Sequence, residues 1–156
     1  MPNGYIAKRE SDKLKIVYEE KPSGPYSYQV DTLPGTCDVK EFSQRLSFKL
    51  ESTLPGKLDQ QSATTAVLDF NQIELPITVR TIQDGDQFQP FGCDYLKSVN
   101  RFCMDKKIPK SRRNQLPVVF SGDRVIWIAG IQIDDRVKVT ASTRTVLKIE
   151  MEPVHV

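Results

Sequence analysis

The feature that most constrains this chain is a series of short runs in which apolar and polar residues alternate, separated by turn signals. Residues 46–50, for example, read Leu-Ser-Phe-Lys-Leu, and residues 77–81 read Ile-Thr-Val-Arg-Thr. Alternation with a period of two is typical of strands that bury one face. Similar β-leaning runs occur at residues 5–7, 14–18, 26–30, 66–70, 116–120, 124–129, 131–139 and 145–151. The sequence therefore predicts antiparallel sheets, with the first two of these runs forming an opening hairpin.

One segment, residues 96–107, follows the helical period instead. On a helix, one side of this segment carries Leu96, Val99, Phe102 and Cys103, and the opposite side carries Lys97, Arg101 and Asp105. The pattern predicts an amphipathic helix with its apolar face inward and its charges outward. Pro109 ends it, because the residue before a proline avoids the helical conformation. A short second turn then carries Lys110, Arg112 and Arg113. Together these patterns predict an α+β fold of layered antiparallel sheets with one main helix.

A polar stretch between residues 52 and 65 carries Pro55-Gly56 and Ser62 and is the best candidate for an internal boundary. We therefore divide the chain into a β-rich N-terminal half, residues 1–62, and a C-terminal α+β region, residues 63–156. In the second half, apolar residues occupy both alternating sets between residues 125 and 129. That strand is expected to be covered on both faces, with Trp127 as a core anchor rather than a surface for stacking bases.

Few residues suit catalysis or metal binding. The only histidine is His155, and the sequence has no glycine-rich phosphate loop of a familiar kind. The three cysteines are widely spaced, so neither a disulfide framework nor a structural zinc site is expected, and a reducing cytoplasm is the simplest setting. The pairs Asp84/Asp86 and Asp134/Asp135 are interpreted as turn residues that bond to local backbone. No apolar run approaches the roughly 20 residues that a membrane span requires, and from the first residues no secretory leader is expected.

Positive charge is concentrated in one segment. The whole chain has 22 Lys and Arg against 20 Asp and Glu. Residues 97–113 contain seven basic residues and one acidic residue, a net charge of +6, and the remainder of the chain is acidic. Such segregation is typical of proteins that bind polyanions, although charged runs are also common as solvated faces. Charge placement alone leaves DNA, RNA, an anionic lipid and an acidic protein open as partners.

A longer pattern resembles a known family. Residues 75–81 and 85–92 read LPITVRT and GDQFQPFG, and they resemble the pattern PLTVRTRRPGDRFRPLG in the C-terminal domain of bacterial tRNA(Ile)-lysidine synthetase. The likeness continues through DKKIP at residues 105–109, IWIAG at residues 126–130 and IDDRVKVT at residues 133–140. It is specific from about residue 75 to residue 147. The chain departs from the family pattern at Gln87 and Gln132, where the family has arginines, and these changes lower the positive charge.

The resemblance implies a function. The family's enzymes use ATP to attach lysine to the wobble cytidine of an isoleucine tRNA, and their catalysis belongs to an N-terminal PP-loop domain with an SGGxDS motif. This chain lacks that motif. It is therefore expected to be the tRNA-binding C-terminal region, with ATP and magnesium held by the missing domain and no cofactor of its own. The resemblance further implies a likeness to a domain of the phenylalanyl-tRNA synthetase β subunit and contact with the tRNA acceptor stem.

Partners and contact residues follow from the same resemblance. The implied partners are isoleucine tRNA and the catalytic domain, with a homodimer left open and no membrane expected. The family pattern supplies the candidate RNA contacts Arg80, Lys97, Lys106, Lys107, Arg113, Arg136 and Lys138. Charge placement adds Arg101, Lys110 and Arg112. Two alternatives stay open: Arg80 and Arg136 pair with neighbouring aspartates as structural residues, or the basic face docks on an acidic protein.

Overall fold

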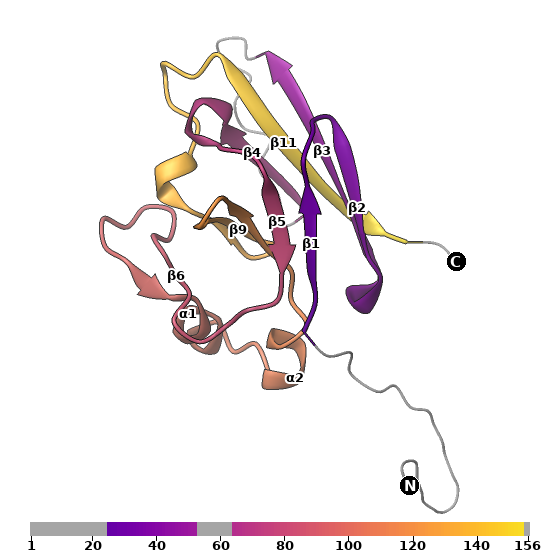
Figure 1. Ribbon diagram of the computed structural model, residues 1–156. Helices are drawn as coiled ribbons and strands as arrows, with labels where there is room; N and C mark the ends of the chain where they lie inside the picture. Colours follow the sequence, from indigo (N-terminus) through magenta and orange to yellow (C-terminus); the bar gives the residue numbers. More distant parts are fainter. Residues whose placement is uncertain (1–24, 53–63, 155–156) are drawn as a thin grey trace, which may run out of the picture.

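The computed structural model describes residues 25–52 and 64–154 (Figure 1). The strands are β1 Ser27–Val30, β2 Gly35–Val39, β3 Gln44–Ser52, β4 Thr65–Asp69, β5 Ile77–Arg80, β6 Gln87–Phe88, β7 Lys97–Ser98, β8 Val118–Ser121, β9 Arg124–Ile128, β10 Gln132–Ile133 and β11 Thr145–Pro153. The helices are α1 Val99–Asp105 and α2 Lys110–Arg113, with the 3-10 turns η1 Lys40–Phe42, η2 Phe70–Gln72 and η3 Asp135–Val137. The opening hairpin lies outside the described residues.

Two antiparallel sheets make up most of the fold. One has the strand order β1-β5-β8-β9-β10 and the other the order β2-β3-β11-β4. A two-stranded ribbon, β6-β7, leads into α1. In Figure 1 the strands β2, β3 and β11 lie beside β1 and β5, and the two helices lie at the lower end of the molecule. The α+β class and the layered antiparallel sheets are confirmed.

The five-stranded sheet separates two cores. Toward the four-stranded sheet, the first core includes Phe48, Ile77, Val79 and Ile149. Toward α1, the second core includes Phe88, Phe102, Phe120 and Ile128. Strand β9 contributes to both cores, with Ile126 and Trp127 in the first and Val125 and Ile128 in the second. The prediction of a doubly covered strand with a buried Trp127, which is 2% exposed, is therefore confirmed.

Helix α1 is shorter than the sequence predicted. It covers Val99–Asp105 rather than residues 96–107, and Leu96 is 51% exposed instead of lying on the apolar face. The reason is local: residues 97 and 98 pair with β6, and Ser98 then caps the helix by accepting a hydrogen bond from the backbone N–H of Arg101. The rest of the predicted apolar face, Val99, Phe102 and Cys103, is buried as expected.

A strand was also predicted over residues 131–139, and this is wrong. Only Gln132–Ile133 forms a strand there, and η3 follows at Asp135–Val137. Asp134 starts this turn because its side chain accepts the backbone N–H of Arg136. The division of the chain at residues 62 and 63 stays a prediction, although β3 and β11, on either side of it, pair along nine residues.

Candidate nucleic-acid interface

Helix α1 is attached to the sheet through its inner face. The Phe102 ring meets Phe88 edge-on with 5.0 Å between the ring centroids, and Cys103 is fully buried beside them. At the start of α1, the backbone N–H of Val99 donates to the Asp86 carbonyl at 3.0 Å. These contacts fix the direction in which the outer face of the helix presents its side chains.

The end of α1 is a Schellman motif with a lysine in place of the usual glycine. The backbone N–H of Ile108 donates to the Cys103 carbonyl, and that of Lys107 donates to the Met104 carbonyl. Lys107 has φ +66°, in the left-handed region that glycine adopts without strain. A lysine therefore occupies a backbone position at which glycine, which has no side chain, would be more stable.

Helix α2 is bound to α1 by one arginine. The Arg113 side chain donates to the Asn100 amide oxygen at 3.2 Å and to the Ile108 carbonyl at 3.0 Å. Arg113 was predicted as an RNA contact, but its guanidinium is used in this link and is only half-exposed. Asn100 was missed because nothing in its sequence neighbourhood identifies a partner thirteen residues away.

Four other cations of the basic segment follow the end of α1 or lie on α2, and we call them the cationic cluster: Lys106, Lys107, Lys110 and Arg112. All four are exposed, and among the described residues none lies within ion-pair distance of a carboxylate. Two are oriented by aromatic rings: Lys106 lies 5.3 Å from the centroid of Phe102 and Arg112 lies 5.5 Å from that of Phe42. The cluster thus combines positive charge with little local neutralisation.

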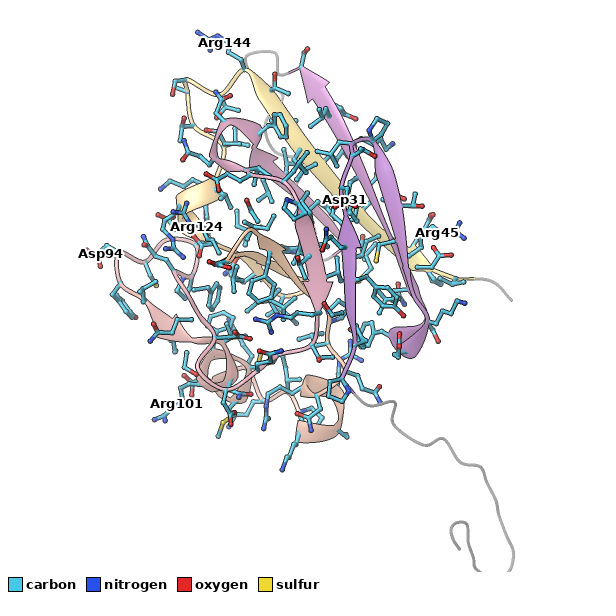
Figure 2. The ribbon with its side chains drawn as sticks, viewed as in Figure 1. Asp31, Arg45, Asp94, Arg101, Arg124 and Arg144 are labelled. Carbon is cyan, nitrogen blue, oxygen red and sulfur yellow. The ribbon has the colours of Figure 1, made fainter. Side chains whose placement is uncertain are left out.

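Lys97 and Arg101, predicted to project outward, differ from each other. Lys97 is 29% exposed and pairs with Asp105 at 2.8 Å, whereas Arg101 is 71% exposed and 3.9 Å from the same carboxylate. The hydrogen bond from Lys97 lowers the pKa of Asp105, and the same bond raises the pKa of Lys97. Figure 2 shows Arg101 pointing away from the body beside α1. Arg101 therefore extends the cationic surface, while the charge of Lys97 is largely compensated.

The remaining three predicted contacts are paired with aspartates. Arg80 donates two bonds to Asp86 at 2.9 and 3.0 Å, and its guanidinium lies 4.0 Å from the Phe120 centroid. Arg136 pairs with Asp134 at 2.8 Å, and Lys138 pairs with Asp135 at 3.2 Å. The sequence left open that Arg80 and Arg136 pair with neighbouring aspartates as structural residues. The structure contains these two ion pairs.

Asp134 and Asp135 hold the loop between β6 and β7, residues 89–96. Asp134 is fully buried, and besides binding Arg136 it accepts the backbone N–H of Gln89 at 2.9 Å. Asp135 accepts the backbone N–H of Gly92 at 3.0 Å, and this bond is the largest cause of its lowered pKa. Asp134 accepts the backbone N–H of Arg136, so it bonds to local backbone as predicted. The bonds from Gln89 to Asp134 and from Gly92 to Asp135 are not local, because each joins residues more than forty positions apart.

A groove of about 680 Å³ lies on another part of the surface. Its lining includes the amides of Asn71, Gln72 and Gln87 together with Glu74 and Arg124. Of the ten predicted RNA contacts it includes only Arg136, which is already paired. The groove and the cationic cluster are therefore separate features.

Other kinds of site find no support in the described part of the chain. No group of three or more His, Cys, Asp or Glu residues is placed there to hold a metal ion. Cys103 is buried, and burial raises the pKa of its thiol, which disfavours the reactive thiolate. Within the same residues, the helices are too short or too polar to cross a bilayer.

Comparison with known families and structures gives a consistent match. Residues 77–150 match the family described as "TilS substrate C-terminal domain". A solved structure titled "Crystal structure of TILS C-terminal domain" superposes with a TM-score of 0.69 at 20% identity, covering 84% of this chain and all of that one. At this identity the likeness shows the fold. The expected likeness to the phenylalanyl-tRNA synthetase β subunit stays a prediction.

Several curated relatives carry one name, tRNA(Ile)-lysidine synthase. The protein from Dehalococcoides mccartyi is 38% identical over 58% of this chain and 19% of its own length. That from Caldanaerobacter subterraneus is 25% identical over 96% of this chain and 30% of its own length. That from Persephonella marina is 28% identical over 94% and 32%, respectively. The chain thus spans between about a fifth and a third of the length of these relatives.

Proposed function

Residues 77–150 belong to the TilS substrate C-terminal domain family, and from this premise we propose that the chain is the tRNA-binding region of a tRNA(Ile)-lysidine synthase. The observation that carries the proposal is the cationic cluster, because it is exposed and no carboxylate of the described residues lies within ion-pair distance of it. Two of its residues directly follow α1, whose inner face is buried, and the other two lie on α2. Phosphates neutralised by such a surface release counterions, which favours binding to any nucleic acid backbone. The name of the curated relatives, tRNA(Ile)-lysidine synthase, supports a tRNA as the class of ligand.

The geometry suits recognition of a duplex by shape. A-form RNA is read mainly through its phosphates and 2′-hydroxyls, because its major groove is too narrow for side chains. The two helices are joined by Arg113, so the cations on each keep a constant spacing. We therefore assign the cluster to the tRNA acceptor stem and reduce the preferred contacts to the four cluster residues and Arg101.

The proposal assigns ligation to a different part of the parent protein. ATP and magnesium would bind to the N-terminal catalytic domain, which is also the proposed partner of this chain within the cytoplasmic enzyme. The chain itself would contribute affinity and orientation by holding the tRNA while the catalytic domain reacts with the wobble cytidine. Lysine, ATP and tRNA incubated with this chain alone should consequently give no lysidine.

Salt dependence tests the proposal. Filter binding of isoleucine tRNA at increasing salt should give a log–log slope of about −3 to −4 if four cations contact phosphates. A flat response would contradict binding through the backbone. Ribonuclease-resistant capture of an acidic protein by the same face would instead support the alternative of a protein-docking module.

Replacing Lys107 with glycine should separate stability from binding. Because Lys107 has φ +66°, Lys107→Gly is expected to raise the free energy of unfolding by about 0.5–1 kcal/mol. The same change should weaken tRNA binding about threefold to tenfold and lower the salt slope by about 1. Urea denaturation and filter binding measure the two effects. The control Lys107→Asn keeps a residue that tolerates this conformation, so it should lose affinity with a smaller gain in stability; a less stable glycine variant would contradict the left-handed assignment.

A further inference from the structure

Exposed apolar side chains are concentrated in the loop between β6 and β7. Six large apolar residues in the described part of the chain are at least 40% exposed, and three of them lie in this loop: Phe91 at 52%, Tyr95 at 58% and Leu96 at 51%. Single exposed apolar residues are ordinary on protein surfaces. Three within six positions form a local apolar surface of the kind that usually meets a ligand.

The loop is held rigidly although its side chains are exposed. Residues 90–93 form a type II turn in which the Cys93 N–H donates to the Pro90 carbonyl at 2.9 Å and Gly92 has φ +88°. The backbone N–H of Phe91 donates to the Ile133 carbonyl, and that of Gly92 donates to Asp135. A loop fastened in this way presents its aromatic rings at little further cost in conformational entropy.

The loop and α1 form one continuous unit. Strand β7 begins two residues after Tyr95 and runs directly into α1, whose exposed face carries Arg101 and leads to the cationic cluster. Asp94 is the loop's only charged residue, and Figure 2 shows it at the outer edge of the molecule. Aromatic rings beside a cationic surface are the combination that binds unpaired nucleotides, since bases stack on the rings while cations neutralise the phosphates.

We propose that Phe91 and Tyr95 are a stacking site for unpaired bases, adjoining the duplex that the cationic cluster binds. This inference rests on the proposed function, because it takes the bound polyanion to be RNA. It goes further in assigning a single-stranded segment to a particular loop. The cluster would follow the phosphates of the stem, and the loop would take bases where pairing ends.

Two RNA probes separate this inference from the function on which it rests. One is a blunt RNA duplex, and the other is the same duplex extended by a short single-stranded tail containing 2-aminopurine. The full chain should bind the tailed duplex at least about fivefold more tightly than the blunt one, the lower end of what one base–aromatic stack contributes. Stacking should also change the 2-aminopurine fluorescence on binding.

The double variant Phe91→Ala/Tyr95→Ala should lose the gain from the tail and the fluorescence change, while keeping its affinity for the blunt duplex. The matched control Leu50→Ala removes an apolar side chain of similar exposure from β3 and should keep both. Because the rings are exposed, circular dichroism of the double variant should match that of the parent chain.

Each remaining outcome is decisive. If the double variant still bound the tailed duplex more tightly than the blunt one by the full factor, the stacking site would be overturned. The two aromatic side chains would then be assigned to contact with a protein partner. Equal affinity of the parent chain for tailed and blunt duplexes would also overturn it, with the proposed function intact. Failure to bind either RNA would overturn both.

Discussion

Replacing the whole cationic cluster with glutamine is expected to weaken tRNA binding on the order of 100-fold at physiological salt. Each of the four side chains is exposed and free of carboxylates among the described residues, so each should contribute fully to phosphate neutralisation. The salt slope should become shallower by about one unit for each contact removed. Stability should fall only modestly, because the rings of Phe102 and Phe42 lose surface cation–π contacts worth about 0.5–1 kcal/mol each. Filter binding across a salt series measures both quantities.

The control is a second variant with the same change in net charge. It removes four cations that belong to other elements than the cluster, on β3, β9 and β11: Arg45, Lys49, Arg124 and Lys148. Figure 2 shows Arg45 on the side of the molecule opposite Arg101. This variant should keep nearly all of the affinity, because attraction to phosphate is screened beyond a Debye length of about 8 Å. Equal losses in the two variants would show that net charge, rather than the cluster, governs binding.

Replacing Asp134 with alanine is expected to lower the free energy of unfolding by about 3–5 kcal/mol. The fully buried Asp134 carboxylate accepts bonds from the backbone of Gln89 and from both the backbone and the guanidinium of Arg136. Alanine would leave these donors without acceptors, and Arg136 would keep a charge with no counter-ion. Urea denaturation at constant pH measures the loss.

The loop should respond to the same change. Without Asp134, the backbone N–H of Gln89 loses its acceptor, and the link to η3 depends on the bond from the Asp135 N–H to the Gln89 carbonyl. Amide hydrogen exchange in residues 89–93 should therefore accelerate. The comparison variant Asp94→Ala removes an exposed carboxylate from the same loop and should change stability by less than about 0.5 kcal/mol. A cost for Asp134→Ala as small as that would show that the loop does not depend on this aspartate.

Periodicity predicted the elements that depend on burial. Strands such as β5 and β9 have alternating or continuous apolar residues because each must cover a core, and that requirement is visible within five residues. The inner face of α1 was predictable for the same reason. The start of the helix was not predictable in this way, because Ser98 was expected inside the helix and is instead its N-cap. Propensity does not distinguish these two positions for a serine.

Charge placement was a less complete guide to the interface. It located the basic segment, but it did not distinguish exposed cations from paired ones. Lys97 is paired with Asp105 eight residues later, and Arg113 is held by Asn100 from the preceding helix. These pairings depend on how α1 and α2 pack, which is a tertiary property. For Arg80 and Arg136, by contrast, the nearby aspartates in the sequence were a local signal of pairing.

The position of β11 has a consequence for biosynthesis. This strand lies between β3 and β4, and it is the only neighbour of β4 in the four-stranded sheet. During translation, β4 leaves the ribosome some eighty residues before the strand that completes its pairing. Its unpaired edge is then open to other nascent chains. The sheet is complete only after residues 145–153 emerge, and until then β3 also lacks a partner along the edge that β11 will cover.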